Sequence, residues 1–228
     1  MRNIAVVPIL SSKVVQTTKY SEYKYIGEPS NIIKQLSDMG ADEIFVVNIT
    51  GRRYQYHIGQ TDLRFLEKIA KDAFCPLGYG GNLKREEDVD LAVEILKRGY
   101  EKIISSTNWM KHQRFYKDLS DRVGQQSVVK CVELSSDDIL SNKYHRAEYA
   151  ITHADCGEIM LVDILRNGTL NGFNPRLCEL ARKSPVPISV CGGYNGEPSD
   201  IDTAASTYYM LYKGQVMLNY ERHNNTTL

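Results

Sequence analysis

Short apolar runs alternate with amphipathic stretches along most of the chain, and this alternation predicts strands separated by helices. The runs contain few polar breaks, which is typical of parallel strands buried on both faces. We expect strands at residues 4–10, 43–49, 102–105, 127–134, 158–164, 188–191 and 203–211, and another in the run that leads into Gly80 and Gly81. Helices are expected at residues 29–40, from 62 onward, and at 84–98, 112–123, 143–154 and 175–182.

Three segments fit neither pattern. Residues 14–26 are polar and rich in tyrosine, so they form either a loop or a short ribbon. Residues 51–60 form a long polar loop with two arginines and a histidine, and loops of this length in compact domains are often functional. Residues 222–228 are typical of a frayed polar end.

The strand, turn and helix pattern occurs twice. Pro76, Gly81 and Asn82 in residues 74–82 fall in step with a proline and two glycines in residues 186–193. Upstream of each copy, residues 40–51 resemble residues 156–168. We therefore predict an α/β fold, a single (β/α)8 TIM barrel spanning residues 1–228 and built from two half-barrel repeats. Its seventh βα unit is shortened, because too little chain separates Gly193 from Ala204 for a full helix.

The composition of the chain restricts the possible classes of partner and cofactor only slightly. The chain has 228 residues, 42% of them hydrophobic, with 28 basic and 28 acidic side chains. This balance gives no sign of a nucleic-acid or membrane partner. The five cysteines are odd in number and lack metal-ligand spacing, so we predict reduced cysteines in a cytoplasmic protein, with neither a metal nor a cofactor. The first residues enter a strand without the pattern of a signal peptide.

Chemistry in such a barrel sits at the carboxyl ends of the strands. Glycines there let the backbone approach a ligand closely, and amides at a following helix start can hold a phosphate. Ser11, Asn48 and Glu133 also fall directly after or near strand ends. Residues at these positions are the informative ones for function.

A set of motifs in this order resembles the HisA/HisF family, and in particular its HisF branch, the cyclase subunits of imidazole glycerol phosphate synthase. The motifs lie at residues 40–43, 76–81, 101–102, 126–129, 157–159, 167–169, 172–173, 192–193 and 204–206. The resemblance implies a ligand with a phosphate at each end. One phosphate site would use Gly81, Asn82, Ser106 and Thr107, and the other Asn167, Gly168, Gly193, Ala205 and Ser206.

At the family's two acid/base positions this chain departs from the pattern. The family uses aspartates after the first and fifth strands, and here the positions hold Ser11 and Glu133. A serine hydroxyl is no general base near neutral pH without a partner, and Glu133 carries its carboxylate one methylene further out. The family's aspartate at the end of the second strand is Asn48 here.

The other end of the barrel keeps more of the family's features. The family receives ammonia there from a docked glutaminase, through an entrance gated by four charged residues. Glu43, Lys102 and Glu158 match three of them, and the fourth, an arginine, is Ala5 here. Each of the three begins an even-numbered barrel strand, so all three can share one layer. The alternative is a salt-bridge plug that only excludes water.

Three functional hypotheses follow from this resemblance. The first is a HisF-like barrel subunit of a glutamine amidotransferase complex, which binds a phosphosugar-type ligand and conducts ammonia from a HisH-like glutaminase for a sugar amidotransferase of surface-polysaccharide biosynthesis. The second is a cyclase of histidine biosynthesis. The third is a non-catalytic barrel that binds phosphate as a scaffold.

Overall fold

The computed structural model describes residues 2–50, 62–83, 87–106, 113–135, 138, 141–197 and 200–206. The predicted loop at 51–60, Thr107, the polar end at 222–228 and the later part of the predicted eighth strand lie outside these residues. No helix in the described ranges is long and apolar enough to cross a membrane.

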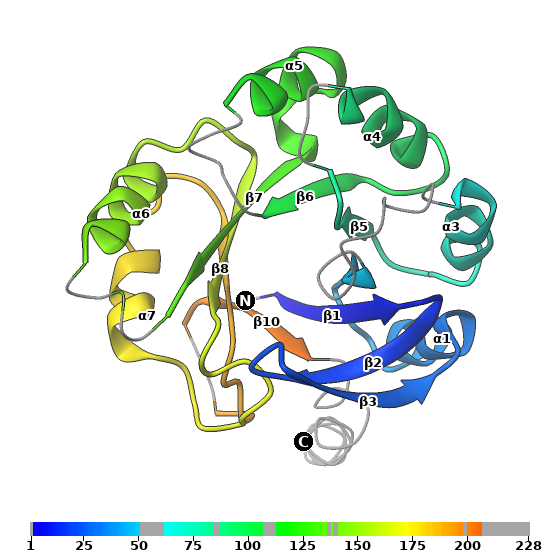
Figure 1. Cartoon of the computed structure of the whole chain (residues 1–228), viewed down its shortest axis with the longest axis horizontal. Helices are drawn as coiled ribbons and strands as arrows, with labels where there is room; N and C mark the ends of the chain where they lie inside the picture. The colour runs from blue at the N-terminus through cyan, green and yellow to red at the C-terminus, as the bar shows by residue number, and fades with distance from the viewer. Residues whose placement is uncertain are drawn as a thin grey trace, which may run out of the picture.

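Eight parallel strands close into a barrel (Figure 1). Each strand pairs with its neighbours in parallel, and the last strand returns to pair with the first, Thr203 opposite Asn3 and Ser206 opposite Val6. The barrel strands are β1 (Asn3–Leu10), β4 (Glu43–Asn48), β5 (Leu77–Gly80), β6 (Lys102–Ser106), β7 (Val128–Leu134), β8 (Glu158–Asp163), β9 (Ile188–Cys191) and β10 (Asp202–Ser206). The predicted (β/α)8 barrel is confirmed.

In the described part of the chain, six helices surround the barrel, and each connects two consecutive barrel strands (Figure 1). They are α1 (Pro29–Asp38), α3 (Leu63–Ala70), α4 (Asp88–Leu96), α5 (Gln113–Val123), α6 (Asn142–Thr152) and α7 (Pro175–Ala181), with a short 3-10 turn η1 (Gln125–Ser127). Between β9 and β10, the described residues 192–197 and 200–201 contain no helix, as predicted for a shortened seventh unit.

Local sequence signals set several helix starts. Asp62 caps α3, with its carboxylate accepting hydrogen bonds from Arg64 N and Phe65 N. Asn174 caps α7 in the same way and is followed by a proline at the first helical position, where no amide hydrogen is needed. These polar residues satisfy amides that have no partner within the helix.

Residues 13–27 form an antiparallel hairpin. Of the two predicted alternatives, a loop or a short ribbon, the structure shows the ribbon. Its strands are β2 (Lys13–Thr18) and β3 (Glu22–Gly27), inserted between β1 and α1. Residues Ser11 and Ser12 make the tight turn from β1 into β2, both with positive φ. The hairpin matters for the site because it folds over the carboxyl end of the barrel.

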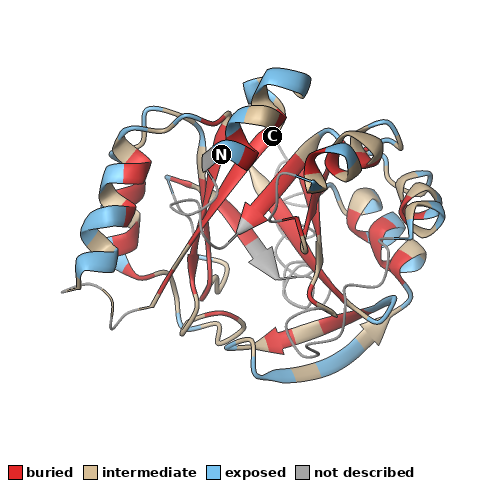
Figure 2. Cartoon of the chain, turned by 45° about the horizontal axis from the view of Figure 1, so that its top comes forward, coloured by how far each residue is buried: buried red, intermediate tan, exposed pale blue. Residues whose placement is uncertain are grey.

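The core has two parts because barrel strands alternate their side chains inward and outward. The larger part lies between the strands and the helices, where Figure 2 shows buried residues on the strands and on the inner helix faces. The smaller part fills the barrel interior. The interior residues are Ile4, Val6, Phe45, Ile104, Val129, Cys131, Met160, Val162, Cys191 and Ala204.

Candidate functional site

The two predicted glycine turns meet at the carboxyl end of the barrel and are built alike. Gly81 has φ +114°, and a Cβ there would lie 2.2 Å from the carbonyl oxygen of Asn48. Gly192 has φ +105°, and a Cβ there would lie 2.4 Å from the carbonyl oxygen of Asp163. Asn48 ends β4 and Asp163 ends β8, so each half places its first turn glycine against the end of the preceding strand. This shared packing supports the half-barrel repeat.

The first predicted phosphate position is partly described. Asn82 follows Gly81 with φ +61° and is half-buried. Ser106 ends β6, where its backbone pairs with Cys131. The side chain of Ser106 and all of Thr107 lie outside the described part of the chain.

The second predicted position is covered by the hairpin. Asn167 is buried, its Oδ1 accepts a hydrogen bond of 2.8 Å from Thr17 Oγ1, and its carbonyl accepts one of 2.9 Å from Lys19 N. A Cβ on Gly168 would lie 2.1 Å from the Thr17 carbonyl. Tyr20, at the hairpin tip, packs against the interior core. The hairpin therefore fixes this loop.

The remaining members of the second position lie beside it. Gly193 has φ +94°, and its carbonyl accepts a 2.7 Å hydrogen bond from Gly172 N. Ala205 and Ser206 belong to β10, where their backbones pair with β1, and their side chains are outside the description. Strand order thus brings the two residues and Gly193 to the same end of the barrel.

The two predicted acid/base residues have different surroundings. Ser11 is exposed at the corner between β1 and β2, and its backbone N donates to Thr50 Oγ1 at 3.1 Å. Glu133 is half-buried on β7 and lies two residues after Cys131, whose side chain faces the barrel interior, so both side chains are on the inward face of the strand. Burial raises the pKa of the Cys191 thiol to about 12, and the nearby Glu133 carboxylate contributes to this rise. Glu133 therefore lies near β9 at the barrel mouth, beside a neutral thiol.

Asp163 is a candidate binding residue that sequence reasoning did not single out. Its side chain is 1% exposed, and Oδ1 accepts hydrogen bonds from Leu165 N at 3.1 Å and Arg166 N at 3.2 Å. Oδ2 accepts one from Asn174 Nδ2 at 3.3 Å. The internal repeat could have identified Asp163, because it aligns with Asn48 when the two halves of the sequence are superimposed. The carboxylate fixes the loop that carries Asn167.

At the opposite end, the three predicted charged residues are in contact. Lys102 Nζ lies 2.7 Å from Glu43 Oε1 and 2.6 Å from Glu158 Oε2. The two carboxylate side chains are 3% and 4% exposed, so the ion pairs are almost removed from water. Burial raises the pKa of Glu43, and hydrogen bonding to Lys102 opposes that rise.

Arg2 and Asp202 complete this cluster, which we call the floor ring: Arg2, Glu43, Lys102, Glu158 and Asp202. The Arg2 guanidinium reaches Glu43 at 3.1 Å, Glu158 at 2.7 Å and Asp202 at 2.8 Å. Burial alone would lower the pKa of Arg2, but hydrogen bonds to Glu158 and Asp202 raise it well above its usual range.

The arginine expected at Ala5 is thus supplied by Arg2. Ala5 packs in the outer core, whereas Ile4 and Val6 fill the barrel interior. Alternation along β1 places Arg2 on the same inward side as Ile4. Sequence matching by position missed this, but the inward alternation of Arg2, Ile4 and Val6 could have identified it.

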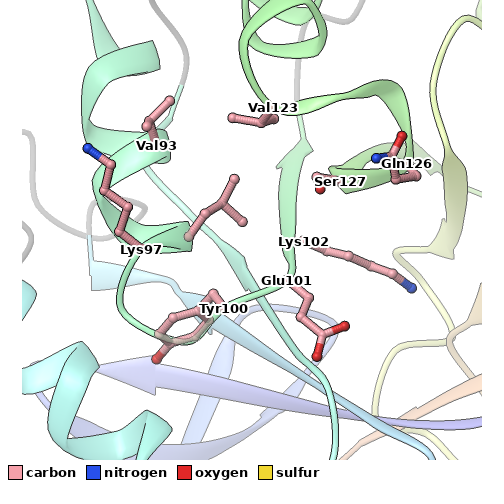
Figure 3. Close-up of a pocket in the computed structure, with 9 residues that line it drawn as sticks. Val93, Lys97, Tyr100, Glu101, Lys102, Val123, Gln126 and Ser127 are labelled. Atoms are coloured by element: carbon pink, nitrogen blue, oxygen red, sulfur yellow. The ribbon is translucent and has the colours of Figure 1, made fainter.

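An open groove of about 680 Å³ lies beside the floor ring (Figure 3). Its walls come from the end of α4, the chain entering β6, and the end of α5 with η1. Its lining residues are Val93, Leu96, Lys97, Tyr100, Glu101, Lys102, Val123, Gln126 and Ser127. Lys102 belongs to both features, because it lines the groove and pairs with the carboxylates of the ring. The groove therefore opens on the amino-terminal face of the barrel.

Among the described residues, no group of three or more histidine, cysteine or acidic side chains is arranged to hold a metal ion. The geometry defines a class: a (β/α)8 barrel with paired glycine turns at its mouth and a buried ionic floor.

Comparison with known proteins places the chain within that class. The model of the family described as "Histidine biosynthesis protein" matches residues 4–217, and the chain belongs to this family. A protein of Vibrio vulnificus printed as "Putative imidazole glycerol phosphate synthase subunit hisF3" is 29% identical, over 94% of this chain and 92% of its own length. "Imidazole glycerol phosphate synthase subunit HisF" of Natranaerobius thermophilus is 26% identical, over 94% of this chain and 85% of its own length.

Proposed function

We propose that the protein is the barrel subunit of a glutamine amidotransferase complex, which receives ammonia from a HisH-like glutaminase at its amino-terminal face and binds a phosphosugar-type ligand at its mouth. The observation that carries this proposal is the floor ring, a cluster of ion pairs around two buried glutamates at the end of a barrel whose interior is lined by apolar and small side chains. The relatives named as subunits of imidazole glycerol phosphate synthase support the same direction.

The apolar lining of the barrel interior favours a neutral molecule over an ion. Above the floor ring, the inward side chains include Ile4, Val129, Phe45, Ile104 and Met160. Such a lining strongly disfavours a bare ion, because an ion leaves its hydration shell without compensation. Ammonia is neutral and small, so it crosses such a lumen at a far lower cost than ammonium. The charged ring then admits the molecule at one point only.

The amino-terminal face offers features of a docking surface. The groove beside Lys102 includes the exposed residue Glu101, while Tyr100 is 3% exposed and forms part of its inner wall. Phe74, which precedes β5 on the same face, is 73% exposed. Aromatic anchors next to polar groups are the typical energetic centres of protein interfaces.

The mouth fits a ligand that ends in phosphate, because its turns present glycine backbone rather than charged side chains. Ser11 supplies no base, which favours passing ammonia onward over cyclisation at this mouth. By resemblance to HisF-like proteins of surface-polysaccharide pathways, the acceptor is the substrate of a sugar amidotransferase. Crystals grown with inorganic phosphate should then show anions near Asn82 and Gly168.

The docking proposal is tested by binding to a HisH-like glutaminase from the same organism and by its glutaminase activity. We expect the chain to co-purify with the glutaminase and to stimulate it. The Phe74→Ala variant should weaken binding at least about tenfold, equivalent to about 1.4 kcal/mol. The matched control is Tyr149→Ala, because Tyr149 is also an exposed aromatic, 65% exposed, but lies on α6. Unchanged glutaminase activity with the full chain present would refute the proposal.

A second candidate, the cyclase of histidine biosynthesis, rests on Glu133. This carboxylate keeps a family acid/base position and lies close enough to β9 to influence Cys191. If it is the working base, the chain should complement a histidine-requiring strain that lacks the cyclase, and Glu133→Gln should abolish growth. Failure of well-expressed wild-type protein to complement would exclude this candidate.

A further inference from the structure

The side chain of Ser189 carries a buried hydroxyl for which the fold provides no hydrogen-bonding partner among the described residues. The residue lies on β9 with 0% exposure, and its Oγ meets no hydrogen-bonding partner among the residues that the structure describes. A buried hydroxyl without a partner costs about 1–3 kcal/mol relative to a satisfied one. Alanine would fill a strand position of this kind without that cost, so the hydroxyl calls for a partner other than the described residues.

The direction of the side chain follows from its strand. Cys191, two residues along β9, belongs to the interior core, whereas Val190 belongs to the outer core. Successive side chains alternate across a strand, so Ser189 points into the barrel with Cys191. The orphan hydroxyl is therefore inside the lumen and not among the helices.

Along the barrel axis, Ser189 lies where the charged residues of the floor ring meet the apolar residues of the interior. Its register partners are Asp202 on β10, a member of the floor ring, and Met160 on β8, a member of the interior core. Asp202 on one side carries a carboxylate that can accept hydrogen bonds, and Met160 on the other side is apolar. A molecule that has just passed the ring would meet this hydroxyl first.

We propose that Ser189 Oγ, together with the Asp202 carboxylate of the floor ring, forms a binding site for one ammonia molecule inside the barrel. Ammonia can accept a hydrogen bond from the hydroxyl through its lone pair and donate to a carboxylate through its N–H groups. The inference rests on the proposed ammonia-conducting function and adds a site to it. Water has similar hydrogen-bonding capacity, so the test must separate the two.

The test uses the isolated full chain and ammonia itself as the probe. Thermal unfolding is followed in increasing ammonium chloride above the pKa of ammonium, with sodium chloride at the same pH and ionic strength as reference. A ligand that binds only the native state raises the melting temperature with its concentration. We expect this rise in the wild type, its loss in Ser189→Ala, and its absence well below the pKa of ammonium.

Ser105→Ala is the matched control. Ser105 is a buried serine on β6 whose Oγ donates to the Leu83 carbonyl at 3.1 Å, so its hydroxyl is already satisfied. This variant should melt at a lower temperature than wild type yet keep the full response to ammonia. Crystals of the wild type should also show one solvent-sized peak within hydrogen-bonding distance of Ser189 Oγ, and crystals of Ser189→Ala should lack it.

Two results would overturn the proposal. One is an equal ammonia response in the wild type and Ser189→Ala, or none in either. The other is a peak at Ser189 without any ammonia-specific rise in melting temperature, which would identify the occupant as water. Because no glutaminase is present, a failed docking experiment leaves this result intact, and a failed melting experiment leaves docking intact.

Discussion

Replacing Lys102 with methionine tests the electrostatics of the floor ring directly. Lys102 Nζ is 2.7 Å from Glu43 and 2.6 Å from Glu158, and these carboxylates are almost fully buried. Removing one partner of a buried ion pair typically costs about 3–5 kcal/mol, because the remaining charge has no compensation. Arg2 still contacts both carboxylates, so we expect a loss near the lower limit, about 3 kcal/mol in the free energy of unfolding.

The same variant should change the pH dependence of stability. Burial already raises the pKa of Glu43 and Lys102 opposes the rise, so Lys102→Met raises this pKa further. A carboxyl with a raised native pKa binds more protons in the native than in the unfolded state, and it loses stabilisation as pH rises through the native pKa. The deficit relative to wild type should therefore be clearly smaller at about pH 5 than at about pH 7.

Urea unfolding followed by circular dichroism at both pH values measures this difference. Lys71→Met serves as control, because Lys71 pairs with Glu67 at 3.1 Å with side chains 73% and 47% exposed. Such an exposed pair contributes at most about 1 kcal/mol. If Lys102→Met lost no more stability than Lys71→Met, or lost the same amount at both pH values, the ring would not be the desolvated ion-pair cluster argued above.

Two further variants test the mouth. Gly81→Ala should cost about 1–3 kcal/mol or more in unfolding free energy, because its φ is +114° and its Cβ would clash with the Asn48 carbonyl. The control is Gly172→Ala, which should cost less, because Gly172 also has positive φ but the nearest atom to its Cβ would lie 3.7 Å away. Equal losses of unfolding free energy, measured by urea unfolding, would contradict the close-contact argument. Asn167→Ala removes the hydrogen bond that Thr17 donates to this side chain. Amide hydrogen exchange should then become faster across the hairpin at 13–27, while the barrel strands stay protected. Unchanged exchange would show that this hydrogen bond does not hold the hairpin in place.

The barrel could be predicted from the sequence because several of its strands, such as β1 and β8, are mainly apolar runs and its glycine turns repeat. The hairpin at 13–27 was left between loop and ribbon for a physical reason. Strand β3 lies mostly exposed, with the burial pattern of an edge ribbon, so no apolar face distinguishes it from a polar loop. Its assignment depends on contacts with the loop around Asn167, which are distant in the sequence.

The floor ring shows both what sequence position predicts and where it fails. Glu43, Lys102 and Glu158 could be placed together because each begins a strand and alternate strands share a layer. Arg2 precedes its strand, and an assignment by position led to Ala5 instead, although the alternation that places Ile4 and Val6 in the interior extends to Arg2. Register decides such cases: a shift by one residue moves a side chain from the lumen to the outer core.

Exposure within the ring also indicates how a partner would act on it. The two glutamates are 3% and 4% exposed, whereas Lys102 and Arg2 are 18% and 32% exposed. Asp202 is 23% exposed, so a protein docked on the amino-terminal face would meet Arg2, Asp202 and Lys102 before the two glutamates. Lys102 also lines the groove, so drawing it toward the partner would separate it from both glutamates at once. A salt-bridge plug needs no partly exposed lysine beside an open groove, so the position of Lys102 favours a gate over a plug.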